Sequence, residues 1–258
     1  MLDTVDENLE APVVTTARAP RKRRVALLVI IGLAIIAIIL IASLTRPGEP
    51  PAETAPTAPG TQQPPAADQN TPPTVPDLSR RIDGDVTALG PVNAPVVLIE
   101  YADYRCPYCG IFTQETLPKI VAEYVDSGQV RVEWRDIPIF GEDSFNAAAA
   151  ARAAGAQGLF WEYNHAVYAH QGDSRKDLPR ATLIELARQV GVADLAAFEA
   201  SLTDPEILGA VAADAQEAQA IGVQSTPSFL VGQTPVMGAQ PIEAFRQVID
   251  AELARVSE

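Results

Sequence analysis

The stretch VVLIEYADYRCPYCGIF, residues 96–112, decides the fold because an apolar, β-branched run passes directly into a helical pattern. A continuous apolar run of this kind is typical of a central strand buried on both faces. Residues 106–128 then carry apolar side chains near helical spacing, and Pro118 is expected to kink that helix. Both cysteines of the chain, Cys106 and Cys109, lie where strand and helix meet.

The position of the cysteines assigns them different roles. Unpaired N–H groups and the helix dipole at the start of a helix favour the thiolate of Cys106. Cys109 lies one turn further along, where its thiolate gains less. Arg105 adds a positive charge beside Cys106, which acts in the same direction. The sequence therefore predicts that Cys106 exchanges with a substrate sulfur and that Cys109 resolves the mixed disulfide.

A C-x-x-C pair can also serve as half of a zinc site or as a structural disulfide. Half of a zinc site would need two more ligands, and the only histidines, His165 and His170, are five residues apart and on different sides of a helix. A structural disulfide would close a loop so short that it constrains the unfolded chain little. A redox pair with no metal and no bound cofactor is the prediction.

The rest of the folded part reads as an α/β arrangement with a helical insertion. Strands are expected at 83–90 and 130–139, and two short strands joined by a turn at 227–240. An alanine-rich helical block spans about 143–219, with a break near 172–179, and a last helix covers 241–256.

Residues 25–44 form an uncharged apolar run of 20 residues, long enough to cross a hydrocarbon layer of roughly 30 Å as a transmembrane helix. A cleaved signal peptide is the alternative, but its apolar region is usually about 7–15 residues long and ends at an A-x-A-like site. Arg46 stands alone after the run, whereas basic residues crowd before it: Arg18, Arg21, Lys22, Arg23 and Arg24. This bias predicts a cytoplasmic basic tail at 1–24 and an exported remainder, in a single-pass cell-membrane protein.

Residues 45–80 are expected to be a disordered linker, because the part from 47 to 76 holds 10 of the 22 prolines and almost no large apolar residue. The catalytic domain is then residues 81–258, tethered outside the cytoplasm. With a net charge of −14, the chain repels nucleic acid and anionic lipid surfaces, so its contact with the membrane is through its own helix.

Two motifs together resemble the DsbA-like branch of the thioredoxin superfamily over about residues 81–258. They are residues 96–112 and the segment GVQSTPSFLVG, residues 222–232. The resemblance implies a thioredoxin-like fold with the inserted helical domain at 143–219. Glutaredoxins share the CPYC sequence, but they lack such an insertion and an exported stalk.

The same resemblance implies further site residues. Pro227 would be a cis-proline facing the disulfide, and the main chain of Thr226 would pair with an extended substrate. Glu100 would be a buried acid with a raised pKa that exchanges a proton with Cys109; alone, a glutamate at the end of a strand could equally reach solvent.

The sequence says less about whether the pair oxidises or reduces its substrates. Pro107-Tyr108, between the cysteines, tunes the potential, and it departs from the Pro-His of strongly oxidising members of the family. The expected activity is to donate the Cys106–Cys109 disulfide to exported proteins, with a membrane-embedded, quinone-linked oxidase restoring it. A reductase or isomerase of the same fold, or a tethered chaperone-like binding module, are the alternatives.

Overall fold

A computed structural model describes residues 77–172 and 174–258. The predicted basic tail, the predicted transmembrane helix and all but the last four residues of the predicted linker lie outside these ranges. Within the ranges described, no helix is both long enough and apolar enough to cross a membrane. The structure therefore shows the domain that was expected to follow the linker.

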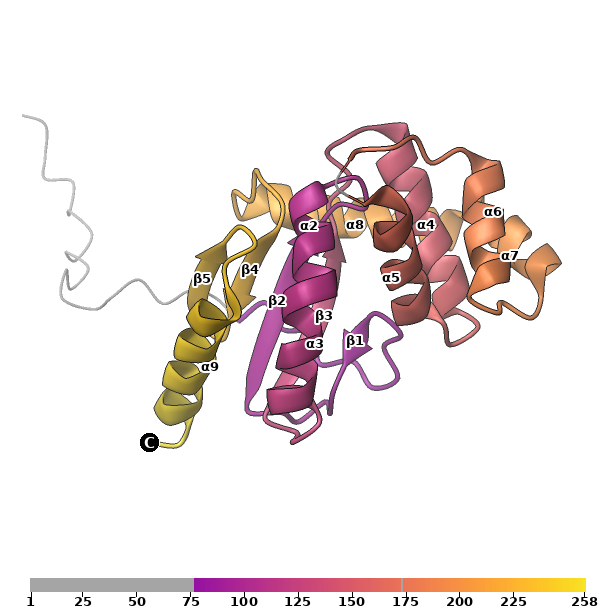
Figure 1. The fold of residues 1–258 in the computed structure, drawn as a ribbon. Helices are drawn as coiled ribbons and strands as arrows, with labels where there is room; N and C mark the ends of the chain where they lie inside the picture. The colour runs from indigo at the N-terminus through magenta and orange to yellow at the C-terminus, as the bar shows by residue number, and fades with distance from the viewer. Residues whose placement is uncertain (1–76, 173) are drawn as a thin grey trace, which may run out of the picture. The chain divides into compact units, whose positions relative to one another are not determined.

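The domain is built on a sheet of five strands in the order β1-β3-β2-β4-β5 (Figure 1). The strands are β1 (Ala88–Leu89), β2 (Val96–Ala102), β3 (Val130–Asp136), β4 (Ser228–Val231) and β5 (Thr234–Met237). β2 lies in the middle and pairs parallel to β3 and antiparallel to β4. Every residue of β2 is buried, which confirms the predicted central strand.

A continuous helical stretch from Pro107 to Val125 makes the crossover between the parallel strands β2 and β3. It consists of α2 (Pro107–Ile111), the π-helical turn η1 (Phe112–Thr116), α3 (Leu117–Ile120) and the π-helical turn η2 (Val121–Val125). Pro118 has no N–H to donate to the preceding turn, and the helix leaves α geometry in η1, directly before α3. Gly128, with a φ of 76°, follows the last turn.

The alternation of side chains along β2 divides the core between the two faces of the sheet. Leu98 joins a cluster with Phe112 of the crossover helix and Phe245 of α9 (Ile242–Val256). Ile99 points to the opposite face and joins a smaller cluster with Ala218. α9 is the predicted last helix, and Figure 1 shows it beside the crossover helix.

The helical insertion between β3 and β4 is confirmed. Its described helices are α4 (Glu142–Gly155), α5 (Phe160–Gln171), α6 (Arg180–Gln189), α7 (Leu195–Ser201) and α8 (Pro205–Ala220). The alanines of α4 pack in one cluster with aromatic residues that include Phe160, Tyr163 and Phe198. The predicted break at 172–179 is the segment between α5 and α6.

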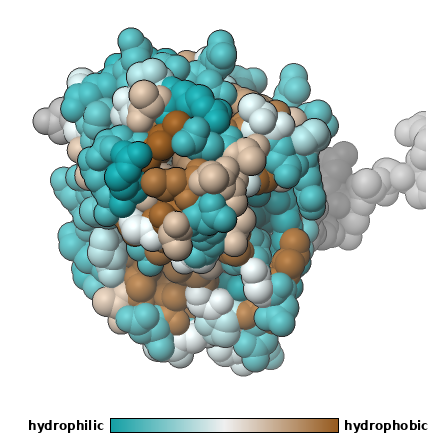
Figure 2. All heavy atoms as spheres, turned by 90° about the vertical axis from the view of Figure 1, so that its right-hand side faces the viewer, coloured by the Kyte–Doolittle hydropathy of each residue, from teal (hydrophilic) through white to brown (hydrophobic). Residues whose placement is uncertain are grey.

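Figure 2 shows the side of the molecule on which α6 and α7 lie in Figure 1. Most of this face is hydrophilic, and a smaller group of hydrophobic residues lies near its middle. α7 leaves Ala196, Ala197 and Ala200 exposed and buries Phe198. α7 therefore directs its large aromatic side chain inward and presents small side chains to the surface.

Two predicted strands are too long. The strand predicted at 130–139 ends at Asp136, and of the strand predicted at 83–90 only Ala88–Leu89 forms β1, because Asp85 closes a turn before it. The carboxylate of Asp85 accepts the N–H and the hydroxyl of Thr87 at 2.9 and 2.8 Å. Next to the predicted domain boundary, the main-chain N–H groups of Arg80 and Arg81 both donate to Glu133 at 2.9 Å.

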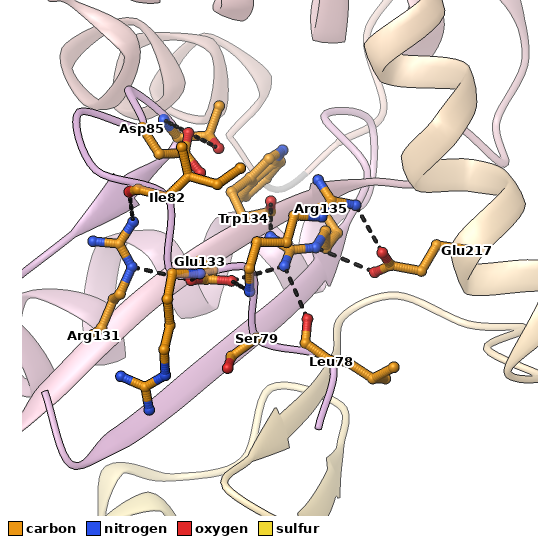
Figure 3. Close-up of polar contacts among 12 residues, drawn as sticks. Leu78, Ser79, Ile82, Asp85, Arg131, Glu133, Trp134, Arg135 and Glu217 are labelled. Atoms are coloured by element: carbon orange, nitrogen blue, oxygen red, sulfur yellow. Dashed lines mark hydrogen bonds and ion pairs between the residues drawn. The ribbon is translucent and has the colours of Figure 1, made fainter. Parts of the chain in front are cut away.

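β3 carries three charged residues on one face, and all of them are buried: Arg131, Glu133 and Arg135. Glu133 accepts from Arg131 Nε at 3.0 Å and from Arg135 Nη2 at 2.7 Å (Figure 3). Residues 78–82 lie over this face, and the carbonyl of Leu78 accepts from Arg135. Burying a carboxylate is tolerated because every side of it has a donor.

Replacing Glu133 with glutamine is expected to remove an acid-sensitive part of the stability. Burial raises the pKa of Glu133, but the N–H of Arg80, the Arg135 guanidinium and the N–H of Arg81 outweigh it and lower the pKa to about 2. The carboxylate therefore stabilises the fold above pH ~4.5, and on the order of 3 kcal/mol is lost as the pH falls through about 2.

Urea unfolding of the full chain at pH 7 and pH 3 measures this effect. The stability gap between wild type and Glu133→Gln should be large at pH 7 and smaller at pH 3. Glu123→Gln, which breaks an exposed pair with Arg246, is the control and should change little. An equal gap for Glu133→Gln at both pH values would contradict the account.

Candidate active site

Cys106 is the N-cap residue of α2, in the turn that follows β2. Its main-chain N–H donates to Asp103 O at 3.0 Å, and its carbonyl accepts from Gly110 N at 3.2 Å. Its thiol donates to the carbonyl oxygen of Thr226 at 3.2 Å, and the Thr226-Pro227 peptide bond is cis. The structure thus brings together the two sequence motifs, which lie 120 residues apart.

The surroundings of Cys106 favour its thiolate. The Cys109 thiol makes the largest contribution to lowering the pKa of Cys106, and burial opposes it. The Thr226 side chain and the N–H groups of Cys109 and Tyr108 lower the pKa further, to about 6. A thiol with this pKa is largely ionised at neutral pH.

Cys109 is in the opposite situation. It is fully buried, whereas Cys106 keeps 4% of its surface exposed. Burial first, and then its contact with Cys106 and the nearby Glu100, raise the pKa of Cys109 well above its ordinary value. Both sulfurs are free thiols in this structure. The asymmetry has the direction that their positions at the helix start predict.

Glu100 lies on β2 beneath the pair and is completely buried. Neither of its carboxylate oxygens has a hydrogen-bond partner among the described residues. Burial, with a smaller effect of Cys106, raises the pKa of Glu100 well above its ordinary value. The solvent-exposed alternative does not hold, and a neutral carboxyl near Cys109 is able to carry a proton.

Thr226 and Pro227 lie in the segment before β4. Within the part of the chain described, the N–H of Thr226 has no main-chain partner. The N–H of Gly238, at the end of β5, donates to the carbonyl of Pro227 at 2.9 Å and holds the segment beside Cys106. A substrate in extended conformation could pair with the free N–H of Thr226.

The residues between the cysteines differ in exposure. Pro107 is the first residue of α2, a position that suits its fixed φ and missing N–H. Tyr108 is 63% exposed, so its ring borders the site while its N–H faces the Cys106 sulfur.

The Arg105 side chain, predicted to tune the site, contacts the segments beside the helical insertion. Its guanidinium donates to the carbonyls of Phe140 at 3.1 Å and Lys176 at 3.2 Å, and pairs with Asp177 at 3.1 Å. These partners belong to the segments before α4 and before α6. The positive charge is therefore shared with the insertion, and the largest contributions to the lowered pKa of Cys106 come from Cys109, Thr226 and Tyr108.

Sequence reasoning missed Asp103 and Tyr168. Both are buried, and the Tyr168 hydroxyl donates to the Asp103 carbonyl at 3.0 Å. The available signal was an aspartate at the end of a buried strand and just before a helix, where its side chain often closes a turn. The partners from the insertion, more than thirty residues away, left no local pattern.

The histidines do not gather near the cysteines. His165 and His170 both lie on α5, and His165 is exposed. Among the residues described, no cluster of three or more His, Cys, Asp or Glu side chains is arranged to hold a metal ion.

A protein-family model described as Thioredoxin matches residues 83–251, which include all five strands of the sheet and the whole helical insertion. The chain belongs to the thioredoxin family. The match contains both cysteines and the Thr226-Pro227 segment.

Several known proteins are similar to this member of the family. The chain is 35% identical over 181 residues to the Na⁺/H⁺ antiporter NhaA 3 of Salinispora tropica, covering 69% of this chain but 26% of the antiporter. It is 28% identical over 172 residues to the probable disulfide bond formation protein D of Bacillus cereus, covering 65% of this chain and 79% of that protein.

Among solved structures, oxidised BdbD from Bacillus subtilis has a similar fold, with a TM-score of 0.61 at 24% identity over 65% of this chain and 92% of BdbD. The chain thus spans about a quarter of the antiporter and most of the other two proteins. Together with the site, the family match and the Bacillus cereus relative support the predicted thiol-disulfide oxidoreductase, and BdbD supports the fold.

The two thiols of the reduced chain are expected to titrate far apart. The absorbance of thiolate near 240 nm should rise in one step with a midpoint near pH 6, the pKa of Cys106. Cys106→Ser should abolish this step. Cys109→Ser keeps a donor to the Cys106 sulfur and should nearly preserve the midpoint, whereas Cys109→Ala should raise it. A first step that survives Cys106→Ser would refute the assignment.

Proposed function

We propose that this chain is an extracytoplasmic thiol-disulfide oxidoreductase that donates a Cys106–Cys109 disulfide to exported proteins. The observation that carries the proposal is the pair itself: a thiol with lowered pKa at a helix start, a buried partner with raised pKa, and Thr226 O at 3.2 Å from the first sulfur. The family and the relative named for disulfide bond formation support it.

In the first step a substrate thiolate attacks the sulfur of Cys106 in the disulfide. The S–S bond breaks, a mixed disulfide forms, and Cys109 leaves with the electron pair. Because the pKa of Cys109 is high, its thiolate takes up a proton, which the neutral carboxyl of Glu100 supplies.

In the second step another substrate thiolate attacks the substrate sulfur of the mixed disulfide. Cys106 leaves as a thiolate, which its surroundings stabilise, and the substrate holds a new disulfide. The substrate dithiol is oxidised by two electrons and the Cys106–Cys109 pair is reduced by two.

The direction follows from the stabilised Cys106 thiolate. Whatever stabilises the reduced form makes the disulfide a stronger oxidant. The Arg105 guanidinium binds groups beside the insertion, and its effect on the Cys106 thiolate stays a prediction. The lowered pKa of Cys106 supports the oxidase direction, and the reduction potential tests it.

Location and regeneration are part of the proposal and rest on the sequence. The basic flank and apolar run at 25–44 support an anchor with a cytoplasmic N-terminus and an exported catalytic domain. A membrane-embedded, quinone-linked oxidase would then return the reduced pair to the disulfide.

The reduction potential of the full chain, equilibrated with glutathione buffers, tests the direction. We expect a value above about −270 mV, that of thioredoxin, and shifted towards about −120 mV, that of a strong oxidase. A potential near the lower value would make the chain a reductase or isomerase. Cys106→Ser should lose disulfide transfer to an unfolded protein, and a variant that keeps its effect would instead be a chaperone-like binding module.

A further inference from the structure

Asp103 lies between β2 and α2 and is only 1% exposed. Its Oδ1 accepts the N–H of Arg105 at 2.7 Å, within the turn that leads to Cys106. Its Oδ2 accepts the N–H of Phe140 at 3.1 Å, in the segment just before α4. The carboxylate thus joins the cysteine turn to the start of the helical insertion.

The main chain of Asp103 contacts both the cysteines and a second part of the insertion. Its carbonyl accepts from the N–H of Cys106 and from the hydroxyl of Tyr168 on α5, each at 3.0 Å. Its N–H favours the thiolate of Cys109. The ring of Tyr168 also packs on Gly110, where an added Cβ would lie 3.4 Å from it.

We propose that Asp103 is a positioning residue through which the helical insertion sets the reactivity of the Cys106–Cys109 pair. The inference rests on the proposed function, because it names a further residue for the same reaction. Asp103 holds the turn from two insertion segments at once, and the turn holds the Cys106 sulfur against Thr226 and the N–H groups of α2.

The two oxygens of a carboxylate suit this role better than an amide. Each oxygen of Asp103 accepts a main-chain N–H from a different segment. Asparagine has one acceptor oxygen and an NH₂ group, so it would satisfy one N–H and present donors to the other. A buried N–H without a partner is unfavourable, and the turn is expected to shift to relieve it.

The test is the thiolate titration of the reduced full chain, together with its equilibrium with glutathione. Asp103→Asn should raise the Cys106 midpoint by about 0.5 to 1 pH unit, the effect of about one lost hydrogen bond. If the substitution only removed the negative charge of Asp103 and did not move the turn, the midpoint of the Cys106 titration would fall. A lowered or unchanged midpoint in Asp103→Asn therefore overturns the proposal.

Tyr168→Phe provides a second test that leaves all charges in place. It removes one hydroxyl bonded to the Asp103 carbonyl and should raise the midpoint in the same direction, by less. If circular dichroism shows that Asp103→Asn does not fold, the Tyr168→Phe titration is the deciding test. An unchanged Cys106 midpoint in Tyr168→Phe would overturn the proposal.

Asp194→Asn is the matched control, since the Asp194 carboxylate accepts the N–H of Ala197 at 2.8 Å at the start of α7, within the insertion. It should leave the midpoint unchanged, and a rise as large as that of Asp103→Asn would overturn the proposal. A wild-type chain that does not exchange disulfides with glutathione contradicts the proposed function instead.

Discussion

The contact between the Cys106 sulfur and the Thr226 carbonyl depends on the place of β2 at the centre of the sheet. β2 ends one turn before Cys106, and its antiparallel neighbour β4 begins one residue after Pro227. Their register pairs Tyr101 with Ser228, so the end of one strand and the start of the other meet at the same edge. A shift of one residue in this pairing would turn the side chains of β2 to the wrong faces and separate the two segments.

Two buried glutamates of the same sheet have pKa values shifted in opposite directions. Glu100 on β2 has no hydrogen-bond partner among the described residues, and burial raises its pKa. Glu133 on the adjacent strand faces donors from Arg131, Arg135 and residues 80–81, which lower its pKa to about 2 despite burial. Because neutral carboxyls donate protons and fully paired carboxylates do not, the first suits chemistry and the second suits stability.

The sequence was sufficient for the parts of the fold that have a local signature. The apolar run of β2, the helix that starts at Cys106, the insertion and the Thr226-Pro227 segment all lie where predicted. The first three follow from periodicity and turn residues, and the Thr226-Pro227 segment follows from the motif that carries the family resemblance.

Contacts between distant segments have no signature in the sequence. The partners of the Arg105 side chain lie 35 and more residues away, in or beside the insertion. The partner of the Arg80 N–H is Glu133 on β3. Charged residues alternating along β3 gave no sign that residues 78–82 would cover them.

The central claim is that the Cys106 sulfur reacts with the substrate and that Cys109 resolves the mixed disulfide. Trapping of the mixed disulfide tests this claim most directly. Full-length Cys109→Ser and Cys106→Ser variants would each be reacted with a disulfide-containing peptide and analysed by mass spectrometry. The account predicts that the peptide attaches rapidly through Cys106 in Cys109→Ser at pH 7, and that Cys106→Ser remains almost unmodified. Equal labelling of the two variants, or faster labelling through Cys109, would contradict it.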